Sequence, residues 1–165
     1  MRQFQQRKAT RLRGIDYGEC GSYFLTICTQ DRQQLLGNVV GGGVLDAPHV
    51  QLSEFGKIAE RVIRAMDETY EDLSVDRFAI MPDHLHLLIT IREFSGTSGT
   101  PSPTNRRIPF LVSTLKRLTN REIGRPIWQR SYYDHVVRNQ TDYDEIMQYI
   151  QNNPAAWAER KNLIP

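Results

Sequence analysis

The sequence lacks several features that would assign it to a common class of protein. It has only two cysteines among 165 residues, and Cys20 and Cys28 match neither a disulfide framework nor a metal-thiolate spacing, so we expect free thiols in a reducing compartment. No apolar run approaches the roughly 18 residues of a membrane helix, and the basic N-terminus precedes no apolar signal-peptide segment. These absences predict a cytoplasmic protein without a membrane segment.

A large excess of one charge is also missing, because the net charge is only +2. The distribution is nevertheless uneven: residues 1–15 hold five basic groups and no acid, and residues 104–130 hold seven basic groups and one acid. Such a separation can attract polyanions such as nucleic acids. Two solvated faces that balance each other would have the same composition, so charge alone leaves both interpretations open.

Hydrophobic spacing predicts alternating strands and helices. The expected strands cover residues 23–30, 75–82, 84–93 and 127–138, and the expected helices cover residues 54–69, 108–124 and 142–153. Pro82 and Asp83 should join the second and third strands tightly, as a hairpin. Ser53 and Asp142 are predicted helix caps, and Gly124 is a predicted helix stop.

This order of elements predicts one α+β domain over residues 1–165. The expected fold is a ferredoxin-like β-α-β-β-α-β antiparallel sheet with an appended C-terminal helix. Pro154 should interrupt that last helix, with a short helix restarting over 154–161. A basic N-terminal arm is expected over 1–20, and the Ser-, Gly- and Pro-rich residues 95–107 are expected to form a mobile loop.

Half of the four histidines lie two residues apart in the apolar stretch MPDHLHLLI, residues 81–89. Side chains alternate along a strand, so His84 and His86 should project from one face while Leu85 and Leu87 belong to the buried face. Converging imidazoles can bind a transition metal, and a divalent ion can polarise a phosphoryl oxygen. Two hydrogen-bonded or surface histidines are the alternative, which this short motif does not exclude.

A candidate nucleophile lies on the last predicted helix. Ile146 and Ile150 mark its core-facing stripe, whereas Tyr149 lies on a flank beside Asn153, four residues later. The phenol has an ordinary pKa of about 10, so it would need a polarised phosphate or a base to react. Packing of the tyrosine, and capping by Asn153 of a helix that starts at Pro154, are the alternatives.

Together these residues resemble the HUH single-strand DNA endonucleases, which carry histidine, a hydrophobe and histidine on a strand and a tyrosine on a helix. More specifically, the chain is similar to the REP-associated tyrosine transposases, relatives of the single-tyrosine transposases of small insertion sequences. The stretches that carry the similarity occur in the family's order over about 20–157: YFLTICTQDRQQLLG, FAIMPDHLHLLITI, WQRSYYDHVVRN and YIQNNPAAW.

The resemblance implies a metal-dependent endonuclease and strand transferase acting on single-stranded DNA that forms REP-like hairpins. His84 and His86 would bind Mg²⁺ or Mn²⁺, and Tyr149 would attack a DNA phosphate, giving a 5′-phosphotyrosine and a free 3′-OH. Related enzymes place a glutamine ligand four residues after the tyrosine, where this chain has the shorter Asn153. The REP-associated branch also implies a monomer, whereas the insertion-sequence relatives are commonly dimers.

Basic side chains of the N-terminal arm and of residues 106–130 would then hold the DNA backbone. These candidates are Arg7, Lys8, Arg11, Arg13, Arg106, Arg107, Lys116, Arg117, Arg121 and Arg130. Candidates for stacking on unpaired bases, each with packing as the alternative, are Phe4, Trp128, Tyr132 and Tyr133.

Two other functions remain open on the sequence. A non-catalytic ferredoxin-like module derived from a transposase would bind nucleic acid without cleaving it. A small metal-dependent hydrolase would use water in place of Tyr149 and leave no protein attached to the DNA. A covalent protein–DNA adduct distinguishes the transposase chemistry from both.

Overall fold

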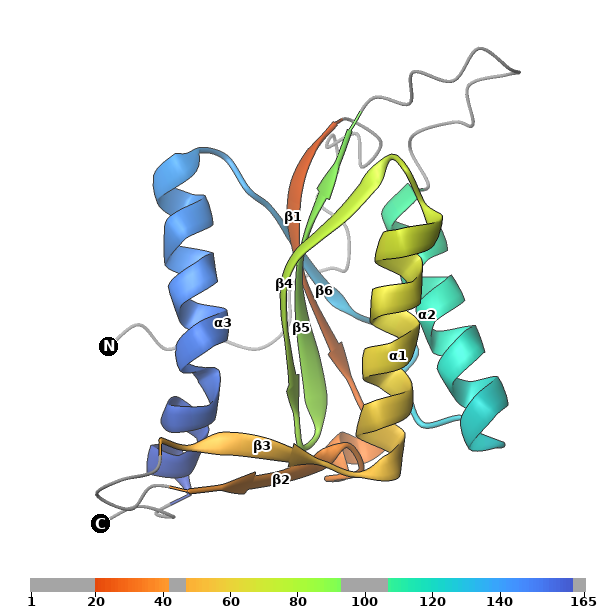
Figure 1. The fold of residues 1–165 in the computed structure, drawn as a ribbon, viewed down its shortest axis with the longest axis vertical. Helices are drawn as coiled ribbons and strands as arrows, with labels where there is room; N and C mark the ends of the chain where they lie inside the picture. Colours follow the sequence, from red (N-terminus) through yellow and green to blue (C-terminus); the bar gives the residue numbers. More distant parts are fainter. Residues whose placement is uncertain (1–19, 42–46, 93–106, 162–165) are drawn as a thin grey trace.

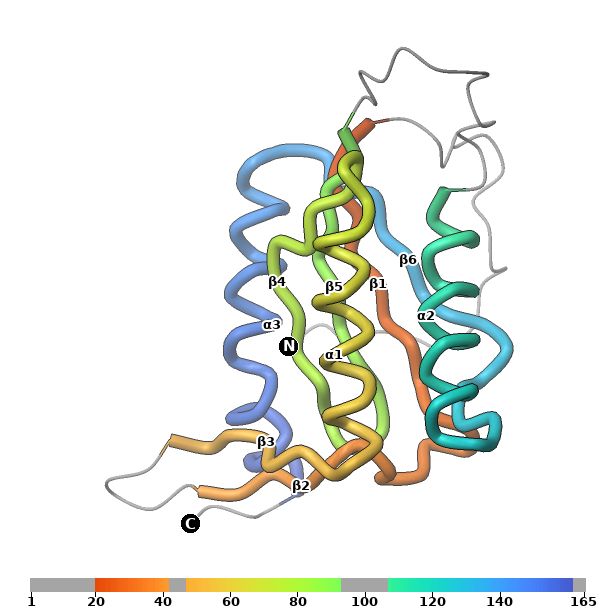
Figure 2. The backbone as a smooth tube through the Cα atoms, turned by 45° about the vertical axis from the view of Figure 1, so that its right-hand side comes forward, coloured from red at the N-terminus to blue at the C-terminus, as the bar shows by residue number. Residues whose placement is uncertain are grey.

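The computed structural model describes residues 20–41, 47–92 and 107–161. These form a four-stranded sheet between two helical layers, with a two-stranded hairpin across one end (Figures 1 and 2). In chain order the elements are β1 (Gly21–Cys28), η1 (Gln30–Arg32), β2 (Gly37–Val40), β3 (His49–Leu52), α1 (Glu54–Thr69), β4 (Leu73–Met81), β5 (His84–Ile91), α2 (Arg107–Ile123), β6 (Tyr133–Val136) and α3 (Gln140–Arg160).

The sheet confirms the predicted fold class. Its strands lie in the order β4, β5, β1 and β6, and each neighbouring pair is antiparallel. This is the ferredoxin-like β-α-β-β-α-β arrangement, with α3 appended. The β4–β5 hairpin turns at Pro82 and Asp83 as expected, and α1 begins after Ser53, whose hydroxyl accepts the N–H of Gly56.

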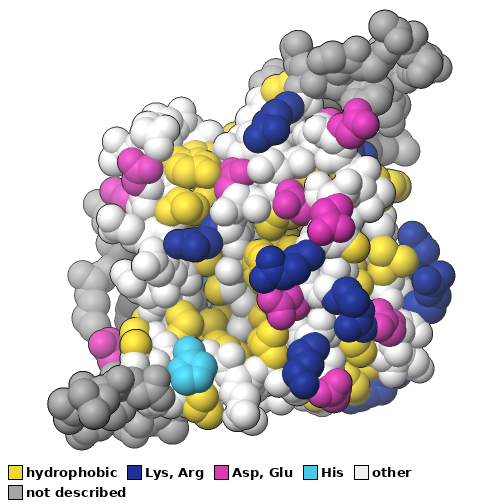
Figure 3. Space-filling view, viewed as in Figure 1, with side chains coloured by type: hydrophobic (Ala, Val, Ile, Leu, Met, Phe, Trp, Pro, Cys, Tyr) yellow, Lys and Arg dark blue, Asp and Glu magenta, His cyan; other side chains and the backbone are white. Residues whose placement is uncertain are grey.

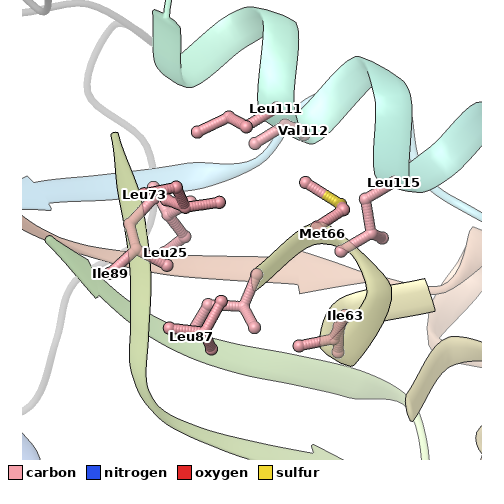
Figure 4. A pocket seen from close by; sticks show the side chains of 10 residues that line it. Leu25, Ile63, Met66, Leu73, Leu87, Ile89, Leu111, Val112 and Leu115 are labelled. Carbon is pink, nitrogen blue, oxygen red and sulfur yellow. The ribbon is translucent and has the colours of Figure 1, made fainter. Parts of the chain in front are cut away.

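Alternation along the strands sends apolar side chains to both faces of the sheet. On one face, Leu25, Leu87 and Ile89 point toward Met66 of α1 and Leu111 of α2, around a cavity of about 20 Å³ with an apolar lining (Figure 4). This small cavity lacks polar groups, so it is a packing feature of the main core. On the other face α3 covers a smaller cluster, whose buried members are Phe24, Leu88, Ile146 and Ile150.

The fourth strand is shorter than predicted. β6 covers Tyr133–Val136 instead of 127–138, and Trp128 makes only an isolated bridge to Thr29. Between this bridge and β6, the ammonium of Lys116 donates to the backbone carbonyls of Gln129, Arg130 and Ser131. Continuous pairing with β1 begins only at Tyr133.

The prediction that Pro154 interrupts the last helix is wrong. α3 runs from Gln140 to Arg160 with Pro154 inside it. Proline in a helix interior costs about 3 kcal/mol, but the residues beyond it include the buried Trp157 and Ala158, whose burial offsets that cost. Asn153 therefore lies in the middle of a helix and does not cap one.

The N-terminal cap of α3 is also not the predicted one. Asn139 is the capping residue, and its side chain accepts the N–H of Asp142. The Asp142 carboxylate in turn accepts the N–H of Arg138 and lies 2.9 Å from Nε2 of His135. Reciprocal bonding of this kind satisfies two backbone donors, so Asp142 stabilises the first turn from inside the helix.

Two predicted segments lie outside the described residues. These are the N-terminal arm over 1–20, apart from Cys20, and the loop over 95–107, apart from Arg107. In the three described ranges no helix combines the length and the apolar character that crossing a bilayer requires.

Gly56 should be essential to the junction between α1 and the preceding chain. A Cβ at this position would overlap the carbonyl oxygen of Leu36, which already accepts the N–H of Ser53 at 3.0 Å. We expect Gly56→Ala to lower the free energy of unfolding by about 2–3 kcal/mol, as overpacking typically does. Urea denaturation measures this.

The neighbouring exposed position provides a matched control for that substitution. Lys57 is exposed and forms a surface ion pair with Glu54, so Lys57→Ala should change stability by less than about 0.5 kcal/mol. Equal stability of the two variants would contradict the close packing of Gly56 against Leu36.

Candidate functional site

The two histidines of β5 face each other on the α3 side of the sheet. Their side chains are 7% and 3% exposed for His84 and His86, and their Nε2 atoms are 3.1 Å apart. Two nitrogens that ligate one ion at about 2.1 Å each are separated by about 3 Å when the angle at the ion is near 90°. This spacing, which the two rings bridge by a hydrogen bond, is also compatible with two ligands of one ion.

The remaining ring nitrogens are held by neighbouring side chains. Nδ1 of His84 lies 2.5 Å from a carboxylate oxygen of Asp83, and Nδ1 of His86 lies 2.9 Å from the hydroxyl of Thr26 on β1. When Nδ1 of His84 carries the proton and donates a hydrogen bond to the Asp83 carboxylate, Nε2 has a lone pair that can bind a ligand. Such outer contacts fix the ring orientation of metal-binding histidines.

Burial also affects the charge of His86. Burial is the largest cause that lowers the pKa of His86 to about 3, and the neighbouring Arg32 and Arg160 act in the same direction. The imidazole of His86 is therefore neutral near pH 7. A neutral ring is the form that can donate a lone pair to a metal ion.

α3 places three successive turns of side chains over the histidines. The ring of Tyr149 lies 5.3 Å from the ring of His86, and the ring of Trp157 lies 5.8 Å from the ring of His84, measured between centroids. Asn153 lies between these two residues on the same helical stripe, because residues four apart are neighbours on a helix. The stripe therefore faces the histidine pair along its length.

Asn153 has an unusual environment for a polar side chain. It is 1% exposed, and neither its amide oxygen nor its amide nitrogen has a hydrogen-bond partner among the described residues. Buried polar groups in proteins are almost always paired, so an unpaired amide calls for an explanation. Its place between Tyr149 and Trp157 makes it the candidate third ligand beside the two imidazoles.

Tyr149 is the exposed member of the site. Its side chain is 48% exposed although its ring makes edge contacts with His86 and with Phe24. Phe24 itself stacks on His86, with the ring planes 28° apart. The aromatic contacts fix the phenol ring next to the histidines and leave the residue accessible to a large ligand.

No group of three His, Cys, Asp or Glu side chains in the described ranges is placed to hold a metal ion. A third protein ligand would therefore have to be an amide, a hydroxyl or a backbone group. The sequence predicted Asn153 for this role. The burial of its side chain in the structure is compatible with that prediction.

Four of the five described basic candidates for DNA contact belong to α2. Arg107 pairs with Asp72, and Lys116 is engaged with backbone carbonyls, as described above. Both belong to α2, on the opposite face of the sheet from α3 (Figure 2). The other three, which are exposed, are Arg117, Arg121 and Arg130. The remaining candidates, Arg7, Lys8, Arg11, Arg13 and Arg106, lie outside the described residues.

The surface beside α1 carries mixed charge. Figure 3 shows basic and acidic side chains interleaved there, without a continuous basic area. Ion pairs between the two signs contribute to this mixture, as for Arg64 with Glu60 and Arg61 with Glu122. This face therefore gives no support to the charge-based expectation of nucleic-acid binding.

The candidate stacking residues divide by exposure. Trp128 is buried and its indole N–H donates to the hydroxyl of Thr119 at 2.6 Å, so it is a packing residue. Tyr132 packs partly against the main core, and Tyr133 is exposed. Phe4 lies outside the described residues.

Several side chains at the site were not predicted from the sequence. Asp83 directly precedes His84, and that adjacency was an available signal. Trp157 follows Asn153 by one helical turn. Because a helix break was expected at Pro154, the sequence did not predict that the two residues share one face of α3. Thr26 and Phe24 reach the histidines only through the pairing of β1 with β5, which local sequence does not reveal.

Sequence comparisons match this chain to a known family. Residues 49–153, which include both histidines, Tyr149 and Asn153, match the family described as transposase, IS200-like. An uncharacterized protein of Haemophilus influenzae is 31% identical over 171 aligned positions, which cover 93% of this chain and 91% of the relative. A second protein of that organism, named provisionally as a REP-associated tyrosine transposase, is 25% identical and covers 84% of this chain and 73% of its own length.

A solved structure shows the same fold. It is described as a REP-associated tyrosine transposase bound to a REP hairpin, and it superposes with a TM-score of 0.60 over 91% of this chain and 74% of the other. At 20% identity this likeness is one of fold. The sequence matches confirm the family resemblance that the motifs indicate.

The unpaired amide at position 153 should reduce the stability of the metal-free protein. Replacing a buried unsatisfied polar group by an apolar one of similar size removes a cost of about 1–3 kcal/mol. We therefore expect Asn153→Leu to raise the free energy of unfolding by about 1–2 kcal/mol in urea denaturation with a chelator present. Asn152→Leu, at the exposed neighbouring position, should give no such gain, and a destabilised Asn153→Leu would indicate that the amide has a partner.

Proposed function

Because the chain belongs to the IS200-like transposase family, we propose that it cleaves and rejoins single-stranded, hairpin-forming DNA through a phosphotyrosine on Tyr149. The observation that carries the proposal is the contact between an accessible phenol ring and a buried pair of convergent imidazoles. A solved relative is described as bound to a REP hairpin, which makes hairpin DNA the substrate class to test first.

A divalent ion, Mg²⁺ or Mn²⁺, fits this site on the chemistry of its donors. The facing Nε2 atoms of His84 and His86 and the unpaired amide of Asn153 would hold it. Imidazole is a ligand that transition metals prefer, so Mn²⁺ is the better match of the two ions. When bound, the ion would supply positive charge next to the phosphate that reacts.

The residues of the chain supply the rest of the chemistry. The phenol oxygen of Tyr149 forms a bond to phosphorus while the bond from phosphorus to the 3′-oxygen breaks. The proton lost by the phenol is balanced by the one that the 3′-oxygen gains. One phosphodiester replaces another, so rejoining needs no nucleotide cofactor.

The arrangement also supports action as a monomer. α3 packs against the sheet of its own chain, and the contacts of Tyr149 with His86 and of Trp157 with His84 are made within that chain. No second copy is needed to bring the nucleophile to the histidines.

Tyr149→Phe should abolish covalent attachment to DNA. The substitution removes the atom that forms the new bond, so we expect adduct formation to fall by at least about 1,000-fold, while hairpin affinity changes by no more than about 3-fold because the ring contacts remain. Denaturing gels of protein incubated with Mn²⁺ and labelled hairpin oligonucleotides measure the adduct, and filter binding measures affinity.

Tyr143→Phe is the matched control, since Tyr143 lies on the same helix and should leave the adduct intact. Binding without any adduct from the wild type would favour the non-catalytic module. Cleavage that persists in Tyr149→Phe and leaves no protein on the DNA would favour the hydrolase.

Mn²⁺ should stabilise the protein through the histidine pair. A ligand that binds only the native state adds about 2.7 kcal/mol at a concentration 100 times its dissociation constant, and calorimetry with and without Mn²⁺ measures this shift. We expect His86→Asn to lose it and His135→Asn to keep it, because His135 lies at the Asp142 cap. An equal Mn²⁺ effect in both variants would place the ion elsewhere.

A further inference from the structure

The turn that follows β1 has a strained backbone close to the site. Asp31 and Arg32 have φ angles of 53° and 55°. These lie in the left-handed region, which residues other than glycine rarely adopt. Two consecutive residues of this kind persist only where surrounding contacts hold them. The turn is therefore a place where the fold maintains an unfavourable conformation.

Hydrogen bonds fix this turn to the connection that precedes His84. Thr29 is fully buried, and both its N–H and its hydroxyl lie 2.9 Å from the backbone carbonyl of Asp83. The N–H of Leu36 donates to the carbonyl of Pro82 at 3.0 Å. The turn and the β4–β5 connection therefore move as one unit.

The guanidinium of Arg32 lies against the Asp83 carboxylate that contacts His84. Its Nη1 lies 3.5 Å from Oδ1 of Asp83, the same oxygen that lies 2.5 Å from Nδ1 of His84. The Arg32 side chain is 54% exposed, and no other side-chain bond is found for it among the described residues. A guanidinium has five N–H donors, so most of them remain available beside the site.

Stability alone does not account for this arrangement. A single exposed ion pair contributes little to folding, and at 3.5 Å the pair with Asp83 is long. Arg160, the other arginine close enough to act on His86, donates its Nε proton to the carbonyl of Ala156 on its own helix. Arg160 is thus bonded to the backbone of its own helix, whereas Arg32 contacts the carboxylate that holds His84.

We propose that Arg32 is a further catalytic residue, whose guanidinium binds a non-bridging oxygen of the phosphate that Tyr149 attacks. The inference rests on the proposed function. Negative charge on the non-bridging oxygens must be balanced as the phenol oxygen bonds to phosphorus and the 3′-oxygen leaves, and fixed donors do this best where they are held in advance. The guanidinium only donates hydrogen bonds in this role, so the proton balance of the step is unchanged.

The test compares charged and neutral forms of the reacting phosphate. Wild-type protein and Mn²⁺ are first incubated with a pool of hairpin oligonucleotides whose single-stranded flanks are randomised, and the linkage joined to protein is read from the adducts. The selected oligonucleotide is then made with a phosphodiester or with an uncharged methylphosphonate at that linkage. Single-turnover rates of adduct formation are measured for Arg32→Ala, Arg32→Lys and the control Arg64→Ala.

The proposal predicts a specific pattern of rates. On the phosphodiester, Arg32→Ala should be slower than the wild type by about 100-fold or more, as for the loss of one donor to a reacting oxyanion. Arg32→Lys should recover part of the rate. Arg64→Ala removes an exposed arginine of α1 that contacts Glu60 and the Phe78 ring and should match the wild type. On the methylphosphonate, Arg32→Ala and the wild type should react at similar rates.

Other outcomes overturn the proposal and are distinguishable from one another. A rate for Arg32→Ala equal to that of Arg64→Ala would exclude a role in the reaction, as would an equal loss on both linkages, which would indicate positioning of Asp83 and His84. Loss of Mn²⁺ stabilisation in both Arg32 variants would likewise indicate an effect on the metal site. Absence of any wild-type adduct would instead refute the proposed function itself.

Discussion

The antiparallel register between β1 and β5 is the constraint on which the site depends. It pairs Thr26 with His86 and Cys28 with His84, which leaves both imidazoles on the α3 side while Leu85 and Leu87 fill the main core. A shift by one residue would exchange the two faces, placing imidazoles in the core and leucines beneath α3. Burial of the leucines in the main core therefore also determines that the histidines face α3. The same packing that stabilises the core keeps the two imidazoles in place.

Those parts of the structure that depend on neighbouring residues could be predicted from the sequence. The helix over Glu54–Thr69 follows from its N-cap and its apolar spacing, and the β4–β5 hairpin follows from Pro82 and Asp83 between two β-rich segments. The shared face of His84 and His86 follows from strand alternation alone. The flank position of Tyr149 follows in the same way from helical periodicity, and the structure gives that residue the exposure expected of it.

The parts that were missed depend on contacts between distant segments. Whether Pro154 ends a helix is decided by the burial of Trp157 and Ala158 beyond it, which only the docking of α3 reveals. Lys116 was counted as a free charge, yet its ammonium bonds three carbonyls of the segment before β6. Arg32 has no distinctive sequence context, because its approach to Asp83 comes from a left-handed turn fixed by Thr29.

α3 continues past Pro154 as one helix. Tyr149, Asn153 and Trp157 therefore belong to the same helix, whereas the histidines belong to the sheet. A tilt or slide of the whole helix against the sheet would displace all three side chains together. Under the proposed function, the position of the phenol and that of the amide relative to the imidazoles would then change together.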